Sequence, residues 1–153
     1  MNKILCVIPC GSKKIWDKIP NAMNVEARHV YIGSFHNKCK EYAEHFYPDS
    51  WCILSAKYGF LFPDDIVPES YNITFNDPFT NPINTTDLII QKIGKHLNVY
   101  DNIVSLGGKN YTDIIKKVFH DKEVIAPLSN CKGMGYMMQF MSEQLEQCST
   151  THP

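Results

Sequence analysis

Short runs of apolar residues alternate along this chain with segments whose apolar residues recur at helical spacing. The apolar runs cover residues 4–8, 51–55, 102–106 and 123–126, and each is continuous instead of alternating with polar residues. Continuous runs are typical of parallel strands that are covered on both faces. The pattern therefore predicts four buried strands.

A helical pattern follows each of these runs. It covers residues 35–47, 85–97, 110–120 and 135–148, with Thr85 or Thr86 as the N-cap of the second helix. Strands that alternate with helices indicate a three-layer α/β sandwich around a central four-stranded parallel sheet. Right-handed crossovers give the strand order 2-1-3-4. We expect one α/β domain over residues 1–147 and a polar C-terminal tail over residues 148–153.

The segment 57–82 departs from the alternation. It contains four prolines and shows little periodicity. A loop of this length inside a compact domain is usually functional or disordered. Aromatic residues such as Tyr58, Phe60, Phe62, Tyr71 and Phe79 disfavour disorder, so we predict a functional loop.

Composition narrows the classes of partner. The chain has 153 residues and a formal net charge of −1, which argues against a broad basic face that grips duplex nucleic acid. A local basic pocket for one phosphate is compatible with that charge.

The six cysteines form no CxxC pair and no zinc-finger spacing, so we predict no metal and no cofactor. Without a secretory h-region or a membrane-length apolar run, we expect a cytoplasmic protein with no membrane partner.

Polar stretches follow all four predicted strands. They read PCGSKK, SAKYGFLFPDD, GGKNY and PLSNCKGMG in chain order, and each contains glycine and lysine. The carboxyl ends of parallel strands meet at one edge of a sheet, where α/β proteins bind ligands. We therefore predict a pocket at that edge. The ligand-binding candidates are Cys10, Gly11, Ser12, Lys13, Ser55, Tyr58, Gly107, Gly108, Lys109, Ser129 and Asn130.

Each stretch also has a purely structural interpretation. PCGSKK is either an anion cradle, in which Lys13 or Lys14 meets the charge, or a solvated turn. Cys10 is a candidate nucleophile, but no histidine lies nearby in sequence, which favours a packing role. The Asp64–Asp65 pair either handles a proton or a sugar hydroxyl, or forms a turn. Asn110 is also suited to cap the helix that follows it.

These stretches resemble an uncharacterised family of small bacterial and phage domains that open with PCGSKK or close variants. The match extends from residue 8 to about residue 140 and includes YIGSFHNKCKEYA, ILSAKYGFLFPDD, LGGKNY and APLSNCKGMG. The opening is also similar to the start of a domain in the archaeosine synthase and tRNA-guanine transglycosylase group. APLSNCKGMGYMMQF and IVSLGGKNYTDII are more distantly similar to the uracil-DNA glycosylase superfamily.

The glycosylase resemblance implies a uracil-DNA-glycosylase-like fold and a pocket for a flipped or free base. The chain departs from that pattern, because PCGSKK holds no water-activating Asp and Ile125 or Ala126 replaces the histidine of the last motif. If the protein is an N-glycosidase, the catalytic carboxylate is then expected from Asp64, Asp65 or Glu69. Lys57 or Lys13 would stabilise the leaving base or a phosphate.

Three functions follow from these observations. The first is an N-glycosidase that acts on a modified base. The second is a non-catalytic module that binds a nucleotide or modified nucleic acid in the same pocket, and the missing Asp and His favour it. The third, a phosphate-handling hydrolase or transferase using Cys10 or Ser12, lacks any accompanying phosphatase spacing or metal cluster. The predicted partner is a nucleotide or nucleic-acid base, free or at a single site in DNA or RNA.

Overall fold

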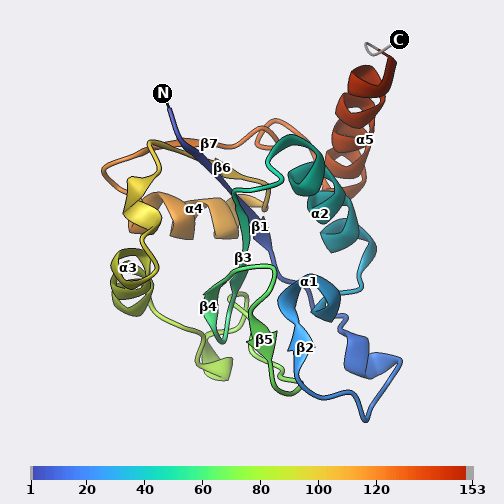
Figure 1. The fold of residues 1–153 in the computed structure, drawn as a ribbon, viewed down its shortest axis with the longest axis vertical. Helices are drawn as coiled ribbons and strands as arrows, with labels where there is room; N and C mark the ends of the chain where they lie inside the picture. The colour runs from blue at the N-terminus through green and yellow to red at the C-terminus, as the bar shows by residue number, and fades with distance from the viewer. Residues whose placement is uncertain (1, 151–153) are drawn as a thin grey trace.

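A five-stranded sheet forms the centre of the domain, in the order β4-β3-β1-β6-β7 (Figure 1). The computed structural model describes residues 2–150, and the side chains of residues 2–147. Strands β1 (Ile4–Pro9), β3 (Trp51–Ser55), β6 (Asn102–Ser105) and β7 (Glu123–Ile125) are parallel. The four predicted strands and their 2-1-3-4 order are confirmed. The antiparallel edge strand β4 (Gly59–Leu61) was not predicted.

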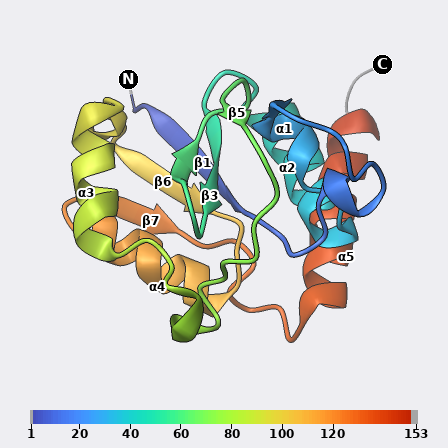
Figure 2. The same ribbon diagram turned by 90° about the horizontal axis from the view of Figure 1, so that it is seen from below.

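Helices cover both faces of the sheet, which confirms the three layers (Figure 2). Helices α2 (Ser34–Phe46) and α5 (Met134–Thr150) pack on one face, and α3 (Thr85–Gly94) and α4 (Lys109–Val118) on the other. Side chains alternate along β1 between the two faces of the sheet. Cys6 and Ile8 belong to the hydrophobic core beneath α2 and α5, whereas Leu5 and Val7 belong to the core beneath α3 and α4. This two-sided burial explains the continuous apolar runs.

Helix α3 differs from its predicted form. Asn84, not Thr85 or Thr86, is the N-cap, and its side chain accepts a hydrogen bond from the Asp87 amide at 2.8 Å. The helix ends at Gly94, and Ile93 is 59% exposed instead of lying on the buried face. Leu97 is buried from a separate 3-10 turn, η3 (Leu97–Val99). The helical period therefore does not extend to residue 97.

The C-terminal helix also extends beyond its predicted end. The backbone of residues 148–150 continues α5, and residues 151–153 of the expected tail lie outside the described residues. No helix within residues 2–150 is long and apolar enough to span a bilayer.

The segment between β3 and α3 makes the largest departure from a simple alternation. Gly59, at φ +76°, turns the chain back from β3 into β4. Strand β5 (Ile66–Val67) then pairs with β2 (Val25–Glu26), which leads into the short helix α1 (Ala27–Val30). The 3-10 turns η1 (Ile15–Asp17) and η2 (Pro78–Thr80) complete the elements. Residues 62–65 are consequently carried away from the carboxyl ends of the parallel strands.

Candidate functional site

A pocket of about 600 Å³ lies at the carboxyl edge of the parallel strands. The loop after β1 forms one wall and the first turn of α4 forms another. The loop of residues 72–76 contributes amide side chains, and Phe35 and Met134 contribute apolar surface. We call this space the carboxyl-edge pocket. Its position matches the pocket predicted from the polar stretches.

Cys10 and Tyr111 join the two main walls. The Cys10 Sγ lies 3.0 Å from the Tyr111 hydroxyl. Burial raises the pKa of the Cys10 thiol, while the contact with Tyr111 opposes this shift. Burial also raises the pKa of Tyr111. Both groups are therefore neutral near pH 7, so Cys10 is a packing and hydrogen-bonding group rather than a thiolate nucleophile.

Lys14 is the buried cation of the pocket. The residue lines the pocket although it is only 4% exposed. Its Nζ donates to the Ser12 carbonyl at 3.3 Å and lies 4.5 Å from the centre of the Tyr71 ring. Within the described part of the chain no carboxylate oxygen lies within 4.0 Å of this ammonium. Burial lowers its pKa, against smaller opposing effects of Cys10 and Asp17.

A chain of hydroxyl groups fixes the ring beneath Lys14. The Tyr71 hydroxyl is hydrogen-bonded to the Tyr31 hydroxyl and lies 2.8 Å from the Ser55 Oγ. Burial raises the pKa of Tyr71 to about 12, so its phenol is uncharged. The Nζ of the exposed Lys57 lies 5.9 Å from the centre of the same ring. The Nζ atoms of Lys14 and of the predicted residue Lys57 therefore both lie near the Tyr71 ring.

Ser55 and Tyr58 have structural partners at this end of β3. The Ser55 Oγ accepts hydrogen bonds from the amides of Lys57 at 3.2 Å and Tyr58 at 3.1 Å, which closes the turn into β4. The Tyr58 ring packs edge-on against Tyr71, with 5.5 Å between ring centres. Neither residue is among those that line the carboxyl-edge pocket. They contact Tyr71, whose ring lies against the Lys14 ammonium.

A buried histidine lies behind the first loop. His36 is 2% exposed, and its Nδ1 is 2.8 Å from the Pro9 carbonyl oxygen. Its Nε2 is buried without a hydrogen-bond partner. Burial lowers the pKa of His36 to about 4, so the ring is neutral at pH 7.

The second wall depends on two adjacent glycines. A Cβ on Gly107 would lie 2.5 Å from the Tyr111 Cβ, so only glycine allows this close approach. Gly108, not Asn110, is the N-cap of α4. Asn110 instead donates to the Asn76 side chain at 2.9 Å, which ties the loop of residues 72–76 to the helix.

Five predicted ligand-binding residues line this pocket, and the others do not. Those in its wall are Cys10, Gly11, Ser12, Gly108 and Lys109. Lys13 is exposed and Ser129 lies in an exposed turn. Asn130 borders a separate hollow beside α5. The buried Gly107 supports the wall through Tyr111.

The structure does not bring Asp64 and Asp65 to the carboxyl-edge pocket. Asp64 pairs with Arg28, and Asp65 accepts from the Phe62 amide at 2.8 Å and pairs with Lys95 at 3.5 Å. The expectation that Asp64 or Asp65 supplies a carboxylate to this pocket is corrected, because β4 runs antiparallel and reverses the chain. The exposed Glu69, in the loop after β5, does not line the pocket either.

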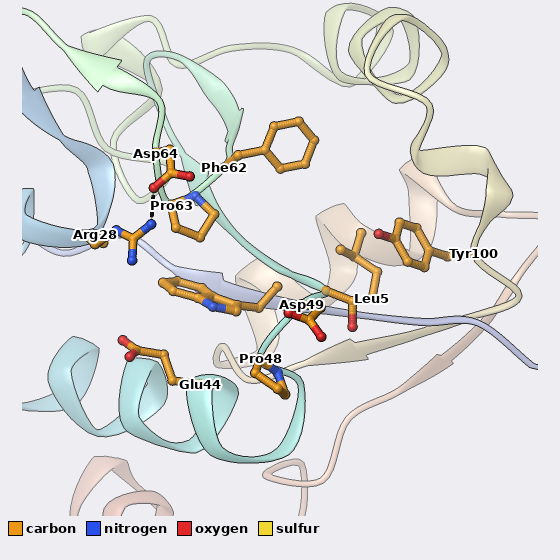
Figure 3. A pocket seen from close by; sticks show the side chains of 11 residues that line it. Leu5, Arg28, Glu44, Pro48, Asp49, Phe62, Pro63, Asp64 and Tyr100 are labelled. Atoms are coloured by element: carbon orange, nitrogen blue, oxygen red, sulfur yellow. Dashed lines mark hydrogen bonds and ion pairs between the residues drawn. The ribbon is translucent and has the colours of Figure 1, made fainter.

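Asp64 lies instead in a second pocket, of about 330 Å³, at the amino ends of β1 and β3 (Figure 3). The carboxylates of Glu44, Asp49 and Asp64 line it together with Arg28. Figure 3 shows Arg28 and Asp64 pointing toward one another. We call this space the amino-edge pocket. The carboxylates and the basic loops thus occupy opposite edges of the sheet.

Several residues of the carboxyl-edge pocket were not singled out from the sequence. They are Phe35, Asn72, Ile73, Thr74, Asn76 and Met134. One feature of the sequence did point to four of these residues. Asn72, Ile73, Thr74 and Asn76 lie in the segment 57–82, which was predicted to be a functional loop. Among the residues that the structure describes, no three His, Cys, Asp or Glu side chains form a group that could hold a metal ion.

Comparison with known proteins places the chain in a family. Residues 5–143 match the model of a family of unknown function, DUF6884. The chain belongs to DUF6884. An uncharacterized protein of this kind, YfjM of Bacillus subtilis (strain 168), is 42% identical over 146 residues, which is 95% of this chain and 97% of the relative. No solved structure matches the chain. The DUF6884 match covers both walls of the carboxyl-edge pocket.

Proposed function

We propose that this protein binds a nucleotide, free or as one unit of a DNA or RNA strand, in the carboxyl-edge pocket. The observation that carries the proposal is Lys14, a buried lysine of the pocket lining whose ammonium has no carboxylate oxygen within 4.0 Å among the residues that the structure describes. A buried cation is costly unless it is paired, so an anionic group of the ligand would complete this site. A phosphate is such a group.

The rest of the wall suits the other parts of a nucleotide. Phe35 and Tyr111 offer aromatic surface, and the side chains of Asn72 and Asn76 offer donors and acceptors for the edge of a base. None of the lining residues is Asp or Glu. The likeness of PCGSKK to the archaeosine synthase group, and of the last two motifs to uracil-DNA glycosylases, supports a base-bearing ligand.

Binding can be tested by calorimetry. The wild-type protein is titrated with nucleoside monophosphates, with the matching nucleosides and with a short single-stranded oligonucleotide. We expect a monophosphate or the oligonucleotide to bind, and Lys14→Ala to weaken that affinity about 10-fold to 100-fold through loss of a charged hydrogen bond. Lys18→Ala removes an exposed lysine nearby and should leave the affinity unchanged. Absence of binding to all three ligands, or equal losses in both variants, would overturn the proposal.

Cleavage of the N-glycosidic bond is a second candidate function. Asp64 and Asp65 do not line the carboxyl-edge pocket. They therefore cannot supply the predicted catalytic carboxylate to a nucleotide bound there. A glycosidase at this site therefore needs a different reacting group. The likeness of APLSNCKGMGYMMQF and IVSLGGKNYTDII to uracil-DNA glycosylases is the observation that favours this second function.

A further inference from the structure

We propose that the ligand of the carboxyl-edge pocket is one nucleotide of a single-stranded polynucleotide, and that the Phe79 ring stacks on another base of the same strand outside the pocket. The inference rests on the proposed nucleotide binding and decides between its two forms. A free nucleotide has no second base for Phe79 to contact, whereas a strand does.

Phe79 is exposed on a turn whose backbone is firmly held. The residue is 97% exposed and belongs to turn η2. The Asp77 side chain caps this turn, because it accepts a hydrogen bond from the Phe79 amide at 3.0 Å. The next residue, Thr80, accepts a hydrogen bond from the Thr74 amide through its hydroxyl at 3.1 Å. An ordered turn therefore presents this aromatic ring to solvent.

The same loop supplies part of the pocket wall. Thr74 and Asn76 line the carboxyl-edge pocket, and the Asn76 side chain accepts a hydrogen bond from Asn110 of α4 at 2.9 Å. Thr80 is hydrogen-bonded to Thr74, so Phe79 is one residue away from a direct contact with the wall. It does not line the pocket itself. This is the position expected of a side chain that meets a base further along the bound strand.

Phe75 shows what a structural phenylalanine does in this loop. Its ring packs edge-on against Tyr111, with 5.5 Å between ring centres, and belongs to the core beneath α3 and α4. Phe79, at 97% exposure, contributes no such packing. A single exposed apolar side chain is common on protein surfaces. Its place beside a pocket with a buried ammonium gives this one a use, since a base of any sequence offers a face for an aromatic ring to stack on.

The charges around the pocket suit a backbone with more than one phosphate. Lys14 and Lys109 line the wall, and no Asp or Glu does. The Lys109 side chain is 87% exposed and pairs with Asp113 at 2.7 Å, and such exposed pairs are weak enough to exchange for a phosphate. The net charge of −1 limits the contact to a short stretch of strand. A strand can meet both ammonium groups, whereas a monophosphate carries one anionic group for the two.

Fluorescence anisotropy tests the inference with labelled oligonucleotides of about ten nucleotides, a length within the usual range of single-strand sites. The probes are a DNA single strand, the RNA strand of the same sequence and the DNA duplex, and an unlabelled nucleoside monophosphate competes with each. We expect a single strand to bind at least about 10-fold more tightly than the monophosphate, since it adds a stacked base. The duplex should not, because its base faces are already covered. The DNA and RNA arms show which sugar the site prefers.

Variants of Phe79 identify the stacking contact. Phe79→Ala should weaken strand affinity about 5-fold to 100-fold, as loss of one stacked base does, and leave monophosphate affinity unchanged. Phe79→Tyr keeps an aromatic ring and should bind the strand as the wild type does. Ile93→Ala removes an apolar side chain that is 59% exposed on α3 and should also retain the affinity. The urea unfolding midpoint of Phe79→Ala should match the wild type, since the ring is exposed.

The outcomes separate the inference from the proposed function. A strand that binds no more tightly than the monophosphate, a duplex that binds as tightly as the strand, or full strand affinity in Phe79→Ala would each overturn the inference. If the monophosphate still binds in that case and Lys14→Ala weakens it, the proposed function stands with a free nucleotide as the ligand. Strand binding that depends on Phe79 but not on Lys14 would place the strand outside the pocket and overturn both.

Discussion

The two edges of the parallel sheet carry opposite chemistry. At the carboxyl edge, Lys14 and Lys109 line a pocket that has no carboxylate in its wall. At the amino edge, Glu44, Asp49 and Asp64 line a pocket whose cation, Arg28, is already paired with Asp64. A buried ammonium with no carboxylate oxygen within 4.0 Å among the described residues is stabilised by binding an anion, whereas the exposed Arg28–Asp64 pair already joins opposite charges. This difference is the basis on which we propose ligand binding at the carboxyl edge and not at the amino edge.

The largest effect expected from this comparison concerns His36 behind the carboxyl edge. Its pKa is about 4 in the folded protein, against 6.5 for the unperturbed side chain. Between these values the unfolded chain binds the proton and the folded protein does not, so stability falls as the pH falls. The expected loss is about 1.4 kcal/mol per pH unit between about pH 6.5 and 4.

Urea unfolding over this pH range measures the effect. His36→Gln should show a shallower loss than the wild type, while His45→Gln, at an exposed position of the same helix, should follow the wild type. Parallel curves for the wild type and His36→Gln would show that His36 is not held neutral by burial.

A second prediction concerns the packing of the carboxyl edge. Gly107→Ala should lower the free energy of unfolding by about 1 to 3 kcal/mol, because the new Cβ overlaps Tyr111. It should also weaken nucleotide binding, since Tyr111 lines the pocket. The control is Gly94→Ala, where no atom lies within 4 Å of the added Cβ. This control should be neutral or slightly stabilising, as expected for alanine in a helix. Equal stability of the two variants would contradict the close approach.

The smallest effect is expected at the amino edge. Asp64→Asn removes an ion pair whose side chains are 80% exposed for Asp64 and 38% for Arg28. The free energy of unfolding should change by less than about 1 kcal/mol, and nucleotide affinity should stay the same. Calorimetry and urea unfolding of this variant, alongside Arg28→Gln, check both points. A large loss of affinity would place the ligand at the amino edge and break the comparison.

The sequence predicted the frame of the fold because two-sided burial leaves a clear local pattern. All four parallel strands and the positions of the four long helices were found from it. Strand β4 was missed because its three residues, Gly59–Leu61, show no period and are stabilised by pairing with β3 and by the Gln91 side chain. The Gln91 contact joins residues that are distant in sequence, which a local pattern does not show.

The same missing strand limited the prediction of the site. The first loop and the start of α4 were placed correctly, because the carboxyl ends of parallel strands must share an edge. Asp64 and Asp65 were assigned to that edge because their stretch follows β3, but one antiparallel strand returns them to the other edge. The sequence also did not distinguish Lys13 from Lys14, since only the backbone bridge from Lys14 to Tyr31 shows which one turns inward.

Amide chemical shifts measured during a titration test the central assignment most directly. The uniformly labelled protein is titrated with the nucleoside monophosphate or oligonucleotide that binds best by calorimetry. The account predicts the largest shift changes at Gly11, Ser12, Gly108 and Tyr111, which line the carboxyl-edge pocket. Largest changes at Glu44, Asp49 and Asp64, with the first group unmoved, would contradict it.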